Sequence, residues 1–428
     1  MSQKKATVDW ARGGNIYEVN IRQYTAEGTF EAFGKHLPRL RDMGIEILWV
    51  MPITPISEKN RQGTLGSYYA CSSYTTINPE FGTLADFKNL VNAAHDLGFK
   101  LIIDWVANHT GWDHPWTLEH PEWYAQDLEG NFTEKNGWHD VIDLDFDNAD
   151  MRMAMIDAMK YWITECRIDG FRCDMAHLVP LDFWIEARHQ CDALTDLFWL
   201  AECEEVAYHD AFDASYAWWW MHVTEKYAKG NASLHEVREV LHAYTQYPQG
   251  AIKLFFTANH DENSWNGTEY EKYGRTAKAW AVFTCTWQGM PLIYSGQESS
   301  NKRRLLFFDK DMIHWQEPLQ LHTFYQTLLQ LRKHSKAIQE GETFVLPTRH
   351  GDQLMAFLRR KEAEVVLVLL NLSTEDRINI TVEHQWLSGN FHNIFSGLSF
   401  TFSGKEKFEL QAGEYVVYKK AILTWVKK

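Results

Sequence analysis

The sequence predicts an α/β protein: a (β/α)8 (TIM) barrel with a small domain inserted after the third strand and a C-terminal antiparallel β-sandwich domain. Three observations lead to this prediction. Short apolar strands alternate with longer helical stretches about eight times over roughly 330 residues, which is within the size range of such barrels. One polar, aromatic-rich stretch breaks the alternation after the third strand. The last part of the chain changes to strands with period-two hydrophobicity.

The barrel strands are expected where unbroken apolar runs occur, at residues 16–20, 47–51, 100–107, 168–173, 197–201, 214–218, 252–258 and 291–294. Helices are expected between them at residues 30–43, 83–97, 151–166, 181–194 and 276–287. Apolar strands separated by helices indicate a parallel sheet that is covered on both faces. A doubly wound open sheet is the alternative. It would carry a G-x-G-x-x-G loop after the first strand, and this sequence has none there.

Two changes in the pattern set the expected domain boundaries. Residues 109–148 are rich in Trp, Asp, Glu, His and Gly and have no clear helical period, so we assign them to the inserted domain. From residue 341 onward, alternating runs such as VVLVLLNLS and EYVVYKK are separated by turn residues. The barrel is therefore expected over residues 1–108 and 149–340, and the β-sandwich over residues 341–428.

Charge and composition disfavour some partners. The formal net charge of -15 at pH 7 disfavours nucleic acid and anionic membrane surfaces, because both attract basic proteins. No run reaches the ~18 to 20 apolar residues of a membrane span, and no apolar segment follows the N-terminal lysines. We therefore expect a cytoplasmic protein; a secreted or periplasmic protein that has lost its leader is the alternative. The six scattered cysteines are expected to be buried free thiols. The sequence does not predict the oligomeric state.

Charged residues interrupt or close several of the predicted strands. Asp104 lies within the third strand, Arg172 and Asp174 lie two apart at the end of the fourth, Glu202 ends the fifth, and Asp261 follows the seventh. A single strand-end Asp is most simply a helix cap or half of an ion pair. Because the carboxyl ends of barrel strands meet at one face, four such cases instead predict a shared pocket.

Convergent carboxylates beside one arginine suit glycoside hydrolysis, which needs one protonated and one ionised carboxyl group flanking the bond. Arg172 lies two residues before Asp174 on the same strand face, and we expect it to keep that carboxylate ionised. Glu202 follows the apolar residues 198–200. Because a drier setting raises the pKa of a carboxyl group, Glu202 is the better candidate for the acid.

Four segments carry a resemblance to a known family. DWVANH, GFRCDMAH, LAECE and FTANHD resemble, in order and spacing, the four sequence regions of the α-amylase superfamily, glycoside hydrolase family 13. The flanking stretches LGSYYACSSYTTINPEFGT, VIDLDFDNADMR and GMPLIYSGQE are similar to family sequences as well. The resemblance covers most of residues 15–340. It implies a barrel enzyme of carbohydrate metabolism whose substrate is an α-glucan oligosaccharide.

The resemblance implies a role for each matching residue. Asp174 would be the nucleophile that forms a covalent glycosyl-enzyme, Glu202 the general acid/base, and Asp261 the stabiliser of the transition state. The substrate-binding residues would be Tyr69, Asp104, His109, Arg172, His177 and His260. A retaining outcome follows, with ~5 to 5.5 Å between the two reacting carboxyl groups. The chain departs from the family at residues 177 and 178, where many members have Lys and then His.

The family requires no cofactor, although many members hold a structural Ca2+. The resemblance implies Asn108 and Asp143 as ligands of such an ion, with Asp140 and Asp145 as further oxygen donors. The alternative is that Asn108 hydrogen-bonds the inserted segment directly, as in calcium-free relatives.

The leading hypothesis is a retaining glycoside hydrolase that cleaves α-1,4-glucosidic bonds of maltooligosaccharides or starch fragments. The nearest alternative is an α-glucan transglycosylase or an exo-acting α-glucosidase with the same catalytic residues, because the covalent intermediate can react with water or with a sugar hydroxyl. A remote alternative is a catalytically inactive binding module, which would lack the carboxylates that this chain retains.

Overall fold

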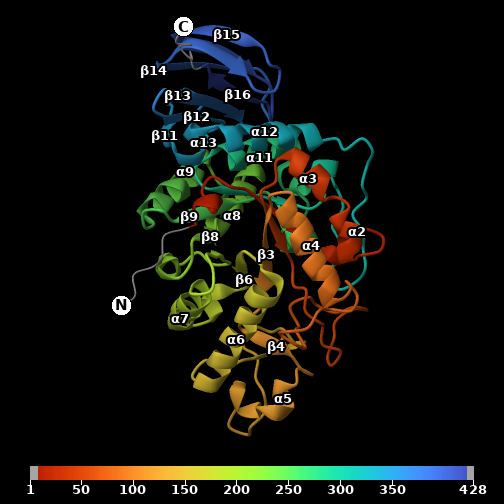
Figure 1. The fold of residues 1–428 in the computed structure, drawn as a ribbon. Helices are drawn as coiled ribbons and strands as arrows, with labels where there is room; N and C mark the ends of the chain where they lie inside the picture. Colours follow the sequence, from red (N-terminus) through yellow and green to blue (C-terminus); the bar gives the residue numbers. More distant parts are fainter. Residues whose placement is uncertain (1–7, 422–428) are drawn as a thin grey trace.

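A closed barrel of eight parallel strands forms the centre of the protein, as predicted (Figure 1). The computed structural model describes residues 8–421; the ends of the outer predicted domains, residues 1–7 and 422–428, lie outside it, and so do the N-terminal lysines used for the leader prediction. The barrel strands are β1 (Ile16–Val19), β2 (Ile47–Val50), β3 (Lys100–Trp105), β6 (Gly170–Cys173), β7 (Phe198–Ala201), β8 (Ala214–Tyr216), β9 (Ile252–Phe255) and β10 (Met290–Tyr294). Their order around the barrel is β1-β10-β9-β8-β7-β6-β3-β2.

The strands are short and buried because their side chains face either the barrel interior or the covering helices. All four residues of β2, for example, are buried. The seventh strand, predicted to reach residue 258, ends at Phe255. Beyond it the chain leaves the sheet and enters a short π-helix, Glu262–Asn266, so residues 256–261 are free to approach the carboxyl-end face.

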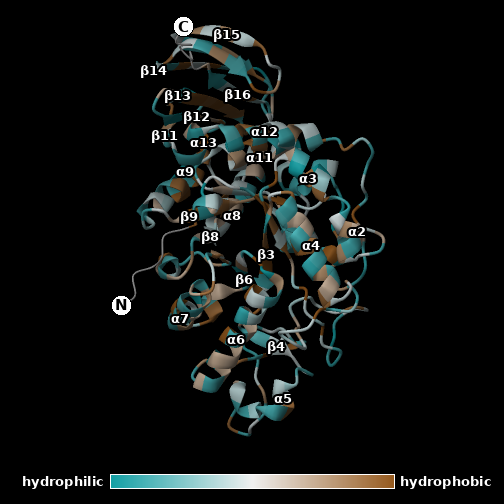
Figure 2. Cartoon of the chain, in the orientation of Figure 1, coloured by the Kyte–Doolittle hydropathy of each residue, from teal (hydrophilic) through white to brown (hydrophobic). Residues whose placement is uncertain are grey.

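Helices cover the barrel, and Figure 2 shows α3 and α4 as largely hydrophilic beside the apolar β3. The helices are α1 (Ile21–Tyr24), α2 (Phe30–Gly34), α3 (Leu37–Met43), α4 (Leu84–Asp96), α5 (Trp116–Glu119), α6 (Ala149–Cys166), α7 (Leu181–Asp192), α8 (Trp218–Ala228), α9 (Leu234–Ala243), α10 (Glu269–Tyr273), α11 (Ala277–Thr286), α12 (His322–His334) and α13 (Lys336–Glu340). Helix α4 begins at a reciprocal cap between Thr83 and Asp86, and its buried residues, spaced as Phe87, Leu90 and Ala94, form one helical face.

The helix predicted over residues 30–43 is two helices, α2 and α3. Pro38 lies at the start of α3, where its missing N–H costs nothing, but it would break a continuous helix at that point. Helix α2 therefore ends at Gly34, and a second helix, α3, begins at Leu37.

The inserted segment follows β3 and carries little regular structure. Strands β4 (His109–Gly111) and β5 (Val141–Asp143) form a two-stranded antiparallel sheet, and α5 lies between them in sequence. This pairing places both ends of the segment beside the carboxyl end of β3. The boundaries predicted at residues 109 and 148, and the one at 341, stay predictions.

The C-terminal region is one antiparallel sheet of six strands, in the order β11-β12-β13-β16-β14-β15. The strands are β11 (Glu342–Val345), β12 (Leu354–Lys361), β13 (Glu364–Asn371), β14 (Ile378–Asn393), β15 (Ser399–Leu410) and β16 (Tyr415–Lys420). Alternate residues of β12 and β13 face two cores. Phe357 packs on Trp287 of the barrel unit at 4.9 Å between ring centroids, whereas Leu358 and Leu367 join a separate core with Ile380 and other residues of β14 and β15. The region is thus two-layered although it is built from one sheet.

The lengths of the helices and the state of the cysteines complete the description of the fold. Every helix within residues 8–421 is too short or too polar to cross a bilayer. All six cysteines are buried and free, as predicted.

Candidate active site

The charged residues predicted at the strand ends meet around Arg172, whose side chain has no exposed surface. Its Nη1 donates to Asp104 Oδ1 at 2.9 Å and to Asp174 Oδ1 at 2.8 Å. Its Nη2 donates to Glu202 Oε2 at 2.7 Å, and its Nε donates to the Tyr216 hydroxyl at 3.0 Å. Because β3, β6 and β7 are parallel neighbours, one guanidinium holds carboxylates that come from three successive strands.

Burial dominates the ionisation of the two central carboxyl groups. It raises the pKa of Asp174 to about 6, although the charge of Arg172 acts in the opposite direction. Burial also raises the pKa of Glu202, again against Arg172. We expected Arg172 to keep Asp174 ionised; its charge does lower the pKa of Asp174, while desolvation raises that pKa by more, to about 6, which still leaves the carboxylate mostly ionised at neutral pH. Two buried carboxyls that share one cation favour a state with one of them protonated.

The backbone after Asp174 turns to contact Glu202. Met175 has a φ of 40° and a ψ of 46°, in the left-handed region, and its N–H donates to Glu202 Oε2 at 3.0 Å. A non-glycine residue in this region is strained by about 1 to 3 kcal/mol, so the surrounding contacts must hold the turn. One of them is the N–H of Ala176, which donates to the Glu202 carbonyl at 3.1 Å. The Glu202 carboxylate is thereby fixed relative to Asp174.

His260 links Asp261 to the first strand. Its Nδ1 contacts the buried Glu18 carboxylate on β1, and its Nε2 lies 2.7 Å from the Tyr69 hydroxyl and 3.2 Å from Asp261 Oδ2. Burial lowers the pKa of His260, but the charges of Asp261 and Glu18 outweigh burial and raise it to about 9. At neutral pH His260 is therefore a cation between two carboxylates. Asp261 keeps 35% of its side chain exposed, so it remains available to a ligand.

Tyr69 connects the two halves of the site. Its hydroxyl donates to Asp104 Oδ2 at 3.1 Å, and its ring stacks on His260 with 5.5 Å between centroids. The Trp49 indole donates to the same Asp104 oxygen at 3.2 Å. With Arg172 on its other oxygen, the Asp104 carboxylate is fully occupied by protein donors. Asp104 is thus placed to brace the site from below.

A cavity of about 250 Å³ lies over these groups. Its lining residues are Gln62, Ser67, Tyr69, His109, Trp138, Asp140, Val141, Asp174, Met175, Glu202, Asp261, Trp265, Phe307 and Phe308. Burial lowers the pKa of His109 to about 4, so its ring is neutral at physiological pH. Neutral His109 and ionisable Asp261 therefore face the same space.

Some of the predicted substrate-binding residues lie off the cavity surface. Asp104, Arg172 and His260 form the layer beneath the lining residues. His177 is exposed on the short helix Ala176–Leu178, and its carbonyl accepts from the Tyr208 hydroxyl at 3.2 Å. The sequence-based prediction treats all four as substrate-binding residues. In the structure Asp104, Arg172 and His260 lie beneath the cavity lining, and His177 lies outside the cavity.

The residues predicted for calcium are hydrogen-bonded to other parts of the protein, and the calcium site stays a prediction. Asn108 Nδ2 donates to Asp143 Oδ1 at 3.2 Å, and the Lys135 N–H donates to Asp143 Oδ2 at 3.2 Å. Each Asp143 oxygen thus accepts one hydrogen bond from the protein. Asp140 Oδ1 accepts from the Gln62 amide instead. Within residues 8–421 no group of three or more His, Cys, Asp or Glu side chains is placed to hold a metal.

Several residues of the site were missed by the sequence analysis. Glu18 interrupts the apolar first strand as Asp104 interrupts the third, so the same signal could have found it. The ring of Trp49 lies 4.8 Å from the Arg172 guanidinium carbon, but an apolar residue within an apolar strand gives no signal. Trp265, in the π-helix after β9, and Phe307, in the segment after β10, could be assigned to the cavity only from the three-dimensional structure.

Comparisons with known proteins agree with this architecture. The family model described as the alpha amylase catalytic domain matches residues 11–122 and 117–306. Alpha-amylase MalA of Haloarcula japonica is 28% identical over 391 residues, which are 86% of this chain. The chain spans 56% of the length of that relative.

Solved structures match over nearly the whole chain. A maltogenic alpha-amylase, AmyB from Thermotoga neapolitana, has a TM-score of 0.88 and 30% identity, covering 96% of this chain and 100% of the other. An alpha-amylase from Lactobacillus plantarum has a TM-score of 0.88 and 31% identity with the same coverage. Together with the geometry around Arg172, the family match over most of the barrel shows that this chain belongs to the α-amylase superfamily, glycoside hydrolase family 13.

Proposed function

We propose that this protein is a retaining glycoside hydrolase that cleaves α-1,4-glucosidic bonds of maltooligosaccharides or starch fragments. The observation that carries the proposal is the single guanidinium of Arg172, which donates to both Asp174 and Glu202 beneath one cavity. Family membership supports the class of reaction, and the relatives named above support an α-glucan as substrate.

In the first step the ionised Asp174 oxygen attacks the anomeric carbon of the bound sugar. The bond from that carbon to the glycosidic oxygen breaks with its electron pair, and Glu202 gives its proton to the departing oxygen. In the second step Glu202, now ionised, takes a proton from water, which attacks the same carbon and releases Asp174. The raised pKa of Glu202 suits the first role, because burial favours the protonated form that can give up a proton.

The other residues stabilise and orient the reacting ring. Asp261, with its exposed carboxylate edge, would bind sugar hydroxyls and strengthen those bonds as positive charge develops on the ring. Neutral His109 and the ring of Tyr69 line the same space and would contact hydroxyls and the apolar ring face. Arg172, Asp104 and His260 act from below, by holding the reacting carboxylates in place.

Transfer to a sugar hydroxyl is the second candidate. It uses the same intermediate, and it is favoured by the open surface next to the reacting carboxylates, where His177 is exposed and Trp219 is 49% exposed. An inactive binding module is disfavoured, because Asp174 and Glu202 are both present and both pair with Arg172. We also propose a cytoplasmic location, for which the six buried free thiols are the support.

The test is incubation with maltotriose and chromatography of the products. Glucose plus maltose means hydrolysis, and longer products mean transfer. Glu202→Gln should cleave maltotriose at least roughly 10²-fold more slowly, which is the scale of general acid catalysis, yet still consume an α-glucosyl fluoride, whose leaving group needs no proton. Glu204→Gln is the matched control, since this neighbouring buried carboxylate pairs with Lys253 at 2.7 Å and does not line the cavity. If Glu202→Gln cleaves maltotriose at the wild-type rate, the proposal is wrong.

A further inference from the structure

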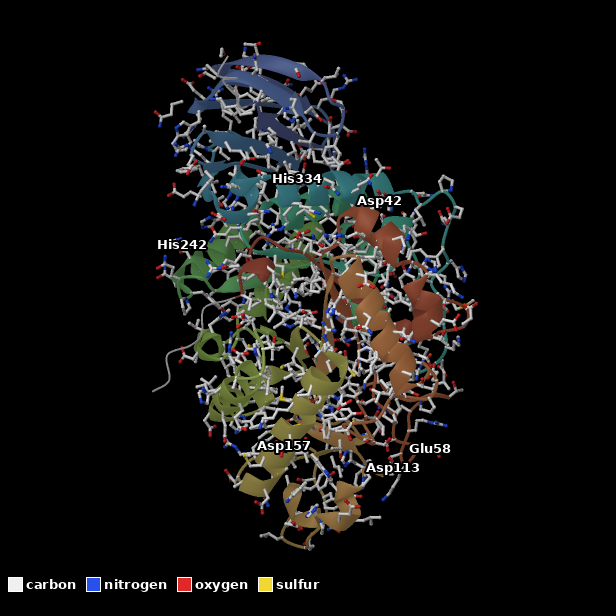
Figure 3. All side chains as sticks on the ribbon, in the orientation of Figure 1. Asp42, Glu58, Asp113, Asp157, His242 and His334 are labelled. Carbon is white, nitrogen blue, oxygen red and sulfur yellow. The ribbon has the colours of Figure 1, made fainter. Side chains whose placement is uncertain are left out.

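The cavity over the site is closed on one side by a wall built from three separate segments. Residues 58–65, which follow β2, are bonded to the inserted segment at two points. The Glu58 N–H donates to Asp113 Oδ2 at 2.8 Å, and Gln62 Nε2 donates to Asp140 Oδ1 at 3.0 Å. Figure 3 shows Glu58 and Asp113 side by side at this edge of the molecule.

The same residues are also bonded to the segment that follows β10. The Thr64 N–H donates to Asp309 Oδ1 at 2.9 Å, and the Leu65 N–H donates to the Phe308 carbonyl at 3.0 Å. Just before these two bonds, Gly63 has a φ of 61°, and a Cβ built on it would lie 2.5 Å from the Phe308 Cβ. The segments therefore pack so closely that they leave no room for a side chain at this position.

Aromatic rings cover the inner face of the wall. Phe307 stacks on Tyr69 with 6.3 Å between centroids, and Trp265 packs on Phe307 at 5.4 Å and on Phe308 at 5.6 Å. All four rings line the cavity. Rings placed in this way suit the apolar faces of sugar rings and fill space that a continuing chain would need.

The wall stands on the side of the cavity away from Glu202. The contacts run in order from Glu202 to Arg172, Asp104, Tyr69 and Phe307. In the proposed reaction Glu202 protonates the oxygen of the leaving sugar, so the reducing-end part of the substrate extends past Glu202. The part toward the non-reducing end extends the opposite way and meets the wall.

Past Glu202, by contrast, the surface is open. His177, three residues after Asp174, is exposed. Val206 is 44% exposed and Trp219 is 49% exposed, and the Trp219 N–H donates to Glu204 Oε1 at 2.7 Å, two residues after Glu202. A long leaving chain therefore has room to extend from the cavity in this direction.

We infer, on the basis of the proposed function, that this enzyme is exo-acting: it takes the non-reducing ends of maltooligosaccharides into the cavity, against the wall, and releases glucose or maltose from them. The cavity of about 250 Å³ is at the small end of ligand pockets, which fits a short chain end better than a continuous polymer. The segment 58–65 and its bonds to Asp140 and Asp309 are the elements that exclude internal bonds.

The experiment compares maltoheptaose that has a free non-reducing end with maltoheptaose that carries a 4,6-O-benzylidene cap on that end. Wild-type enzyme should cleave the capped substrate about 100-fold more slowly, because the free end fits against the wall whereas the added ring of the cap clashes with it. Early products from the free substrate should be glucose or maltose and the correspondingly shortened chain. Equal rates on the two substrates would overturn the inference and leave the proposed function intact. Cleavage of neither substrate would overturn the proposed function itself.

Asp309→Ala removes the anchor of Thr64 and should raise the capped-to-free rate ratio by about tenfold, since the energetic cost of the clash falls when the wall can move. Gln62→Ala tests the other anchor and should raise the ratio in the same direction, so the test does not rest on one variant that folds poorly. Asp127→Ala is the matched control. This carboxylate of the inserted segment accepts only from its own turn, including the Glu129 N–H at 2.9 Å, and does not line the cavity. A wild-type ratio in both wall variants would show that the wall does not set the mode of action.

Discussion

Replacement of Arg172 by lysine tests the central argument, because the charge stays while the shape of the donor group changes. Arg172 makes three charge-assisted hydrogen bonds, to Asp104, Asp174 and Glu202. Lysine has its donors on one atom and cannot reach all three carboxylates. If two of the bonds are lost at about 1.5 to 3 kcal/mol each, the barrier rises by roughly 3 to 6 kcal/mol. This is a fall in kcat of roughly 10²- to 10⁴-fold.

The pH profile gives a second readout of the same variant. Arg172 lowers the pKa of Asp174 against the effect of burial, so a more distant charge should let that pKa rise above about 6. The acid limb of kcat/KM on maltotriose should then move to higher pH. Arg188→Lys is the matched control, because Arg188 is also buried and donates to Asp192 and Asp213 outside the cavity. The reasoning would be refuted if Arg172→Lys kept kcat within threefold of wild type and left the acid limb of its kcat/KM profile at the wild-type pH.

Three further predictions concern charge. In the wild type, kcat/KM should fall below about pH 6, where Asp174 becomes protonated. It should fall again at higher pH as Glu202, whose pKa burial raises, loses its proton; a profile without an acid limb between pH 4 and 8 would contradict this prediction. The pKa of His260 is raised to about 9, above its ordinary value of about 6.5. Protonated His260 therefore adds roughly 3 kcal/mol to the free energy of unfolding below pH 6.5, and this contribution is lost as the pH rises through 9. Glu18→Gln should therefore reduce the loss of Tm between pH 7 and pH 10, and an unchanged loss would count against the pairing. Because both Asp143 oxygens face N–H donors, EDTA should leave Tm unchanged; a fall that Ca2+ restores would show that an ion binds there.

Much of the fold and the central charged residues of the site could be predicted from the sequence, because both depend on local patterns. Unbroken apolar runs such as ILWV form strands buried on both faces, so the order of barrel strands follows from their spacing. Asp104, Arg172, Asp174 and Glu202 stand out because a charge is costly inside such a strand unless it is paired. Since parallel strands carry their ends to one face, their convergence around one arginine was predictable without coordinates.

Other features were decided only by the tertiary structure, since they depend on contacts between residues far apart in the chain. The ionisation of Asp174 follows burial more than the adjacent Arg172, and burial is a property of the packed barrel. His260 becomes a cation only because Glu18, 242 residues away in sequence, lies against it. The wall of the cavity joins segments near residues 62, 140 and 309 through hydrogen bonds that no local pattern encodes. The sequence alone thus determined which chemical groups the site contains, whereas their protonation and the shape of the space above them depend on how the loops pack.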